Sequence, residues 1–279
     1  MNLAATRLTL VLLFTTAALV QSAVPVAAQT RRRADAPPAP RAPTHTPPAP
    51  MSAAEDTTKI PSGDVFRFGE RMVKVPAPDG FEEATPRAPE FRAIALKIIS
   101  NPKMELLAVH LPTDWLNELE RGGEPDGEFY TLTATLKDAK HADFTEQDFA
   151  KMITFADQNR ERILDVNSPL MRDRLRKLRG NIAAVTDGAV QLGAVQVEQL
   201  GLLEKTADVY SMMTLIRYTT EEQGKQVESP MLCALSFLRV SRRAVFVYAY
   251  KTFKTDDDVK LLQDFSKAWT SKIIAANRG

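Results

Sequence analysis

Cysteine and histidine, which build most metal centres and many nucleophilic sites, are scarce in this 279-residue chain. It has one cysteine, Cys233, and three histidines. A single cysteine cannot close an internal disulfide, and no H-E-x-x-H motif or His/Cys spacing of a zinc site is present. The twelve glycines form no phosphate-binding loop, and no G-x-S-x-G motif occurs. The sequence therefore predicts no catalytic residue, no metal and no cofactor.

The chain also lacks a net charge of one sign. It has 36 Lys and Arg against 35 Asp and Glu, and removal of residues 1–28 takes away only Arg7 from this balance. A neutral chain lacks the overall positive field with which proteins attract nucleic acid. We therefore expect no nucleic-acid partner.

Long apolar runs are missing except near the N-terminus, where Leu8–Val20 follows the single charge of Arg7. Small residues ending at Ala28 complete the layout of a secretory signal peptide over residues 1–28, with cleavage after Ala28. The alternative is a retained membrane anchor, but this run of 13 residues is shorter than the ~20 that span a bilayer. We expect an exported protein, periplasmic or extracellular, with no integral membrane span after cleavage.

Residues 29–60 are rich in alanine and proline. Proline occupies seven of the fifteen positions from Ala36 to Pro50. Such a segment cannot bury enough apolar surface to fold, so we predict a disordered, extended linker. Arg31–Arg33 at its start could touch an anionic surface, but a solvated tether is the more ordinary interpretation.

Residues 61–279 contain no second proline- or glycine-rich boundary and predict one α+β domain. Its first half is rich in strand signals, closed early by a Pro78-Asp79-Gly80 turn. The expected elements are two short strands within 65–75, a hairpin formed by 91–100 and 104–112, a short helix within 114–123 and a strand over 128–136.

The middle of the domain has helical spacing. Thr145 with Asp148 predicts the start of one helix, whose apolar face would run on to Ile163. Ser168 with Pro169 predicts the start of a second helix, ending at Gly180. This second helix is basic, and its outer face could meet a membrane surface or a polyanion, or could simply be solvated.

The last hundred residues predict four consecutive strands with short connections, which require antiparallel neighbours. Their ranges are 193–206, 207–222, 226–240 and 242–253. A helix with a regular apolar stripe follows, opened by Thr255 and three aspartates, Asp256–Asp258. Acids in a first turn favour capping over calcium binding.

The strand 242–253 carries aromatic rings at every second position. Phe246, Tyr248 and Tyr250 would share one face of this strand, while the residues between them are small. RNA-recognition sheets display rings in this way, but the K/R-G-F/Y-G/A-F-V-x-F/Y pattern is not matched. We predict a core strand covered by helices on both faces, with the rings in the thicker layer.

The same rings mark the best candidate for a ligand pocket. If the tyrosine hydroxyls are buried, they need partners, and a small apolar ligand could supply them. Ordinary core packing is the alternative. The candidate lining residues are Phe246, Tyr248, Tyr250, Met212 and Trp269.

Few other residues are candidates for a catalytic or metal-binding role. His110 and His141 are expected at the surface or at a strand edge, and Cys233 is expected to be a small buried apolar residue. The acid pairs Glu82-Glu83 and Glu221-Glu222 flank predicted turns, where solvation is the ordinary explanation. An acid-pair enzyme would instead bring two carboxyl groups with raised pKa into one cleft.

Two stretches carry a resemblance to a known family: VPAPDGFEEA (75–84), and AVFVYAYKTF (244–253) running into DDDVKLLQDFSKAWTSKI (256–273). With the order of elements, they make residues 62–279 similar to the PsbP-like family, named after an extrinsic photosystem subunit and found in bacterial exported proteins. The resemblance implies an α/β/α sandwich: a mostly antiparallel central sheet flanked by helices. It also implies action through protein contacts or ligand capture more often than catalysis.

Three functions remain open from the sequence. The first is an exported, non-catalytic interaction or envelope-accessory protein with protein partners in the envelope. The second is a periplasmic carrier of a small molecule or lipid. The third is an enzyme with an acid-pair site that the sequence does not reveal.

Overall fold

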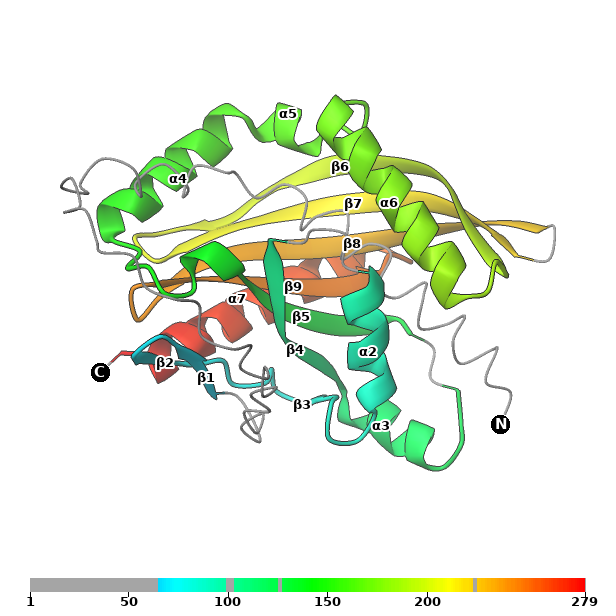
Figure 1. The fold of residues 1–279 in the computed structure, drawn as a ribbon, viewed down its shortest axis with the longest axis horizontal. Helices are drawn as coiled ribbons and strands as arrows, with labels where there is room; N and C mark the ends of the chain where they lie inside the picture. Colours follow the sequence, from blue (N-terminus) through cyan, green and yellow to red (C-terminus); the bar gives the residue numbers. More distant parts are fainter. Residues whose placement is uncertain (1–64, 99–102, 125–126, 223–224, 279) are drawn as a thin grey trace, which may run out of the picture.

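The computed structural model describes residues 65–98, 103–124, 127–222 and 225–278 (Figure 1). The predicted signal peptide and linker, residues 1–60, lie outside this part. In chain order the elements are β1 (Val65–Phe68), β2 (Arg71–Lys74), β3 (Phe81–Glu83), α2 (Pro89–Ile98), β4 (Met104–Pro112), α3 (Thr113–Glu120), β5 (Phe129–Leu136), a 3-10 turn (Lys137–Ala139), α4 (Glu146–Gln158), α5 (Arg160–Leu164), α6 (Pro169–Val185), β6 (Val190–Lys205), β7 (Val209–Glu222), β8 (Lys225–Val240), β9 (Arg243–Thr252) and α7 (Asp256–Ala276).

The main sheet has seven strands in the order β3-β4-β5-β9-β8-β7-β6, and every neighbouring pair is antiparallel. The four strands predicted at the end of the chain therefore do run as consecutive antiparallel neighbours. The two short strands predicted within residues 65–75 are present as β1 and β2, and they pair with each other in a hairpin separate from the main sheet. The α+β class, with a mostly antiparallel sheet in one domain, is confirmed.

Helices cover both faces of this sheet. Figure 1 shows α2 and α6 across the near face and α7 behind it. Three buried side chains of β9, Phe246, Tyr248 and Tyr250, pack in the cluster that holds the apolar faces of α2, α4 and α6. Their smaller neighbours Val245 and Val247 pack with α7 on the opposite face. The prediction of two different packing layers on this strand is confirmed.

The helix starts follow the sequence signals. The Thr145 hydroxyl accepts from the backbone N–H of Asp148, and the Asp148 carboxylate accepts from the backbone N–H of Thr145. Ser168 accepts from the backbone N–H of Met171 at the start of α6. Asp258 accepts from the N–H groups ahead of α7, at Lys254 and Thr255, so this aspartate caps the helix as expected.

The hairpin predicted for residues 91–100 and 104–112 is wrong, because the first of these segments is helix α2. Phe91, Ile94, Ala95 and Ile98 are its buried residues. Their spacing of three, one and three is that of one helix face, and a period of two would have buried other positions. Only the second segment is a strand, β4.

The predicted end of the second middle helix at Gly180 is also wrong, since α6 continues to Val185. The apolar stripe of Leu175 and Leu178 extends to Ile182, which is fully packed in the core and holds this turn in helical form. The helix stops where Asp187 and Gly188 take positive φ values of 51° and 79°. The face predicted to run on to Ile163 is interrupted as well, because α4 ends at Gln158 and α5 begins at Arg160.

Arg92 of helix α2 binds the carbonyl groups at a bulge in strand β4. Strand β4 has a register shift between Leu106 and Ala108, and Arg92 of α2 donates to the carbonyl oxygens of Leu106 and Leu107 at 2.9 and 2.8 Å. Bulges leave such carbonyls outside the regular ladder. The guanidinium group supplies the missing donors.

The layer between the sheet and α7 contains a buried histidine. His110 on β4 is fully buried, which corrects the expectation of a surface or edge position. Its Nδ1 lies 3.1 Å from the Thr131 hydroxyl, and its ring packs edge-on against Trp269. Burial lowers the pKa of His110 to about 3, so the ring is neutral at ordinary pH.

This histidine should make stability depend on pH. The pKa is 6.5 in the unfolded chain and about 3 in the folded one, so below pH 6.5 the unfolded chain binds a proton that the folded chain does not. The free energy of unfolding should fall by about 1 kcal/mol per pH unit from pH 6 toward 3. Urea unfolding at pH 7, 6 and 5 measures how the free energy of unfolding changes with pH, at pH values above those at which most carboxylates titrate. H110N should flatten this dependence, and an equal slope in H110N would contradict this assignment.

Candidate functional site

The five residues predicted to line a pocket do not meet in one place. Phe246, Tyr248, Tyr250 and Met212 belong to the cluster under α2, α4 and α6. Trp269 lies on the other face of the sheet, where its indole N–H donates to the Pro76 carbonyl at 2.9 Å. The tryptophan therefore stabilises the packing of α7 against the chain that follows β2.

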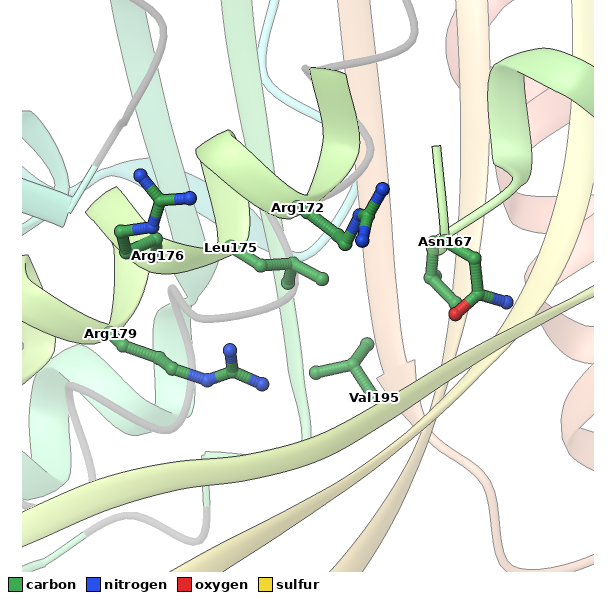
Figure 2. A pocket seen from close by; sticks show the side chains of 7 residues that line it. Asn167, Arg172, Leu175, Arg176, Arg179 and Val195 are labelled. Atoms are coloured by element: carbon green, nitrogen blue, oxygen red, sulfur yellow. The ribbon is translucent and has the colours of Figure 1, made fainter. Parts of the chain in front are cut away.

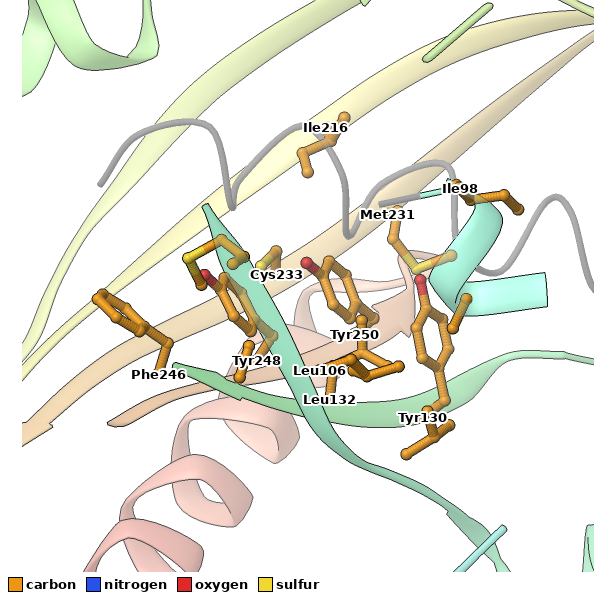
Figure 3. Close-up of a cluster of buried hydrophobic side chains, with 14 of the residues drawn as sticks. Ile98, Leu106, Tyr130, Leu132, Ile216, Met231, Cys233, Phe246, Tyr248 and Tyr250 are labelled. Atoms are coloured by element: carbon orange, nitrogen blue, oxygen red, sulfur yellow. The ribbon is translucent and has the colours of Figure 1, made fainter. Parts of the chain in front are cut away.

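The tyrosines form a stack within their layer (Figure 3). The rings of Tyr130 and Tyr250 lie 4.8 Å apart and nearly parallel, and Tyr248 lies 6.2 Å from Tyr250 with an interplanar angle of 9°. All three side chains are fully buried. Among the described residues, the hydroxyl of Tyr248 finds no hydrogen-bond partner, while those of Tyr250 and Thr214 lie beside the Cys233 thiol.

This layer has no activated nucleophile. Cys233 is buried beside Tyr250 and Thr214, and burial raises the pKa of its thiol well above the usual value, although these two hydroxyls act in the opposite direction. Burial likewise raises the pKa of Tyr248 and Tyr250. The thiol and both phenols are therefore neutral, and the prediction of Cys233 as a small buried residue is confirmed.

The acidic residues that the structure describes show none of the raised pKa values of a catalytic acid pair. The carboxyl groups whose pKa departs clearly from its usual value all shift downward, at Glu120, Asp143, Asp157 and Asp258. An acid-pair enzyme requires at least one upward shift. In the part of the chain that the structure describes, no group of three His, Cys, Asp or Glu side chains could hold a metal ion.

A concave site lies between α6 and β6 (Figure 2). It is a groove of about 360 Å³. Its lining combines apolar residues with one amide and three guanidinium groups. The lining residues are Val166, Asn167, Arg172, Leu175, Arg176, Arg179 and Val195.

Helical spacing places the arginines on one side of α6. Arg172, Arg176 and Arg179 are separated by four and three residues, so they follow one face of the helix. Leu175 and Val195 lie between them in Figure 2, and both are buried. The groove therefore has an apolar floor and a cationic rim.

The three arginines differ in how far they are already engaged. Arg179 donates from Nε to the Leu192 carbonyl at 3.0 Å and from Nη2 to the Gly193 carbonyl at 2.8 Å. Arg176 forms an exposed ion pair with Asp173 at 3.0 Å. Arg172 has no ionic or hydrogen-bonding partner within the described residues, so its guanidinium group is the one most available to a ligand.

A bulge in β6 shapes the other wall. The register with β7 shifts between Leu192 and Val195, across Gly193 and Ala194. The Thr219 hydroxyl of β7 accepts from the Ala194 N–H at 2.9 Å, and a Cβ atom at position 193 would collide with this hydroxyl. Glycine is thus required by the close approach of two strands, and the bulge carbonyls turn toward Arg179.

A second groove, of about 210 Å³, lies at the β8–β9 turn and the end of α7. Two of its arginines already have carboxylate partners. Arg239 pairs with Asp208 at 2.6 Å, and Arg242 pairs with Asp143 at 2.8 Å. Its third arginine, Arg278, has no carboxylate partner among the described residues, but Asp208 places a carboxylate in the lining of this groove, whereas none lines the groove beside α6.

Sequence reasoning identified the basic face of this helix but not the groove. The bulge at Gly193 and the position of β6 below α6 give no local signal, apart from a lone glycine inside a strand pattern. Comparison of the chain with protein-family models, curated proteins and solved structures gives no match. None of the helices in the described ranges has the length and apolar character to cross a membrane.

The unpartnered tyrosine hydroxyl at position 248 can be tested against a bonded one. Tyr210 donates to Asp157 at 2.7 Å, and bonds from Lys205, Tyr210 and Arg160 lower the pKa of Asp157 to about 2 despite burial. Y248F should leave the free energy of unfolding unchanged or raise it by up to about 1 kcal/mol, while Y210F should lower it by about 1–3 kcal/mol. Urea unfolding measures both. An equal loss in the two variants would show that the Tyr248 hydroxyl is bonded.

The two glycines of this region should respond oppositely to alanine. G193A forces a collision with Thr219 and should lower the free energy of unfolding by about 1–3 kcal/mol. G180A lies inside α6 with nothing within 4 Å of the added Cβ, and should raise it by about 0.5–1 kcal/mol. T219A in the G193A background should recover part of the loss. If G193A is as stable as the parent protein, the close approach is not a constraint.

Proposed function

We propose that this protein is an exported, non-catalytic binding protein, an accessory module of the cell envelope that docks an anionic group of a protein partner in the groove between α6 and β6. The signal-peptide layout of residues 1–28 supports export. The proline-rich segment that follows would act as an extended tether for the folded domain. The PsbP-like resemblance stays a prediction and is consistent with a role in protein contacts.

The single observation that carries this proposal is the state of Arg172. It lines a concave site, it is exposed, and no carboxylate of the described chain neutralises it. Arginine forms paired hydrogen bonds to carboxylates and phosphates, so a free guanidinium group beside an apolar floor favours an anionic ligand. The surrounding residues supply no activated nucleophile, which favours binding over turnover.

A carrier of a small apolar molecule is a second candidate function, favoured by the unpartnered hydroxyl of Tyr248. A ligand with a hydrogen-bond acceptor would satisfy this hydroxyl. The layer is closely packed, with rings stacked at 4.8 and 6.2 Å, so a carrier would have to open it. The open groove needs no such rearrangement and is the simpler site.

Reversal of charge on the rim tests the leading proposal. R172E/R176E should abolish capture of a specific partner from envelope extract by the immobilised protein. K151E/K267E is the matched control, because it makes the same change in net charge at two exposed lysines outside the groove. Both variants should unfold near the parental temperature, because all four replaced side chains are exposed and the Arg176–Asp173 pair that R176E removes is a surface ion pair, which contributes little to stability.

The proposal requires that a partner is captured by the parent and the control, is lost in R172E/R176E, and is released by added salt. Capture that is the same in all three proteins would contradict it. Turnover of a defined substrate by the purified protein would contradict the non-catalytic assignment.

A further inference from the structure

Resting on the proposed function, we infer that the group docked in the groove is a short acidic peptide segment of the partner, with one carboxylate side chain next to an apolar side chain. The carboxylate binds Arg172 and Arg176, the apolar side chain lies on Leu175 and Val195, and the peptide main chain contacts Asn167. Each part of this assignment follows from a different property of the groove.

The size of the groove limits the ligand. Its volume of about 360 Å³ is at the lower end of the range for small-ligand sites, roughly 300–1,000 Å³. It can hold one or two side chains but not a folded domain. Because the site is concave, a flat bilayer surface would contact α6 without entering the groove, and a protruding chain segment fits it better.

The distribution of charge selects an amphipathic segment. The guanidinium groups rim a floor formed by Leu175 and Val195, so a purely anionic ligand such as free phosphate would leave this floor uncovered. A carboxylate next to an apolar side chain satisfies both parts. Arg179 is held by two backbone carbonyls, which leaves Arg172 and Arg176 as the groups able to turn toward the carboxylate.

Asn167 distinguishes a peptide from other anions. Its backbone N–H donates to Asp165 at 2.8 Å, which fixes the turn, while its side-chain amide makes no hydrogen bond to any other described residue. An amide offers both a donor and an acceptor, as a peptide group does, whereas a phosphate or carboxylate only accepts. Position 167 therefore matches a ligand that has a main chain.

The bulge also decides how such a segment would bind. Strand β6 is an edge of the sheet, and edges often accept an added strand. Here the carbonyls of Leu192 and Gly193 are already bound by Arg179. We therefore expect docking through side chains and Asn167 rather than extension of the sheet at this point.

The test uses defined probes and the full chain. The blocked peptides ALELEA, ALQLQA and AAEAEA, inorganic phosphate, and phosphatidylglycerol vesicles are titrated by calorimetry and sedimentation. ALELEA should bind at least about tenfold more tightly than ALQLQA, which lacks the carboxylates, and more tightly than AAEAEA, which lacks the apolar side chains. R172E/R176E should lose this binding by at least about tenfold, and K151E/K267E should keep it.

N167A separates the peptide from a bare anion. It should weaken ALELEA by severalfold and leave the affinity for phosphate unchanged. The inference is overturned if ALELEA and ALQLQA bind alike, if N167A has no effect on ALELEA, or if phosphate or vesicles bind as tightly as ALELEA. In each of these cases the proposed function still holds if partner capture depends on Arg172 and Arg176, and it fails separately if capture does not.

Discussion

The packing of β9 on both faces is the constraint from which the layers of this molecule follow. Eight consecutive residues of this strand are buried, and from Val245 to Tyr250 small side chains alternate with large rings. The small residues Val245, Val247 and Ala249 pack on the side of α7, and the rings pack on the side of α2, α4 and α6. Since a strand with two buried faces must be central, the position of β9 between β5 and β8 follows from the same alternation.

The order of strands could be predicted where the connections between them are short. The starts of helices could be predicted where the sequence has a recognisable N-cap residue. The four last strands are separated by two or three residues and could only be neighbours. Helix α2 could not be recognised, because its apolar residues are dense enough to fit a strand until the spacing of Phe91, Ile94 and Ile98 is weighed. Its neighbour β4, equally apolar, has the opposite structure, so the choice depends on tertiary packing.

The candidate site was only partly predictable. Rings on β9 and Met212 on β7 do share a layer, but Trp269 was assigned to it without knowing which face α7 covers. The small residues of β9 do indicate which face α7 covers, because a helix that packs closely on a sheet requires the face without rings. The groove depends on a strand bulge and on a helix crossing it, and neither is encoded in a local pattern.

Two arginines bind the helical layer to irregular points of the sheet. Arg92 of α2 binds the bulge carbonyls of β4, and Arg179 of α6 binds those of β6. In both places the guanidinium group donates two hydrogen bonds to neighbouring carbonyls, which a lysine ammonium on its flexible stem cannot match in geometry.

The double role of Arg179 distinguishes it from the other two arginines of the groove. Arg179 lines the groove and also binds the carbonyls of the bulge in β6. Its replacement would therefore affect the stability of the fold. Arg172 and Arg176 on the rim make no hydrogen bond to β6 among the described residues. If the groove binds a partner as proposed, replacements at these two positions would change which partner is recognised without disturbing the bulge in β6.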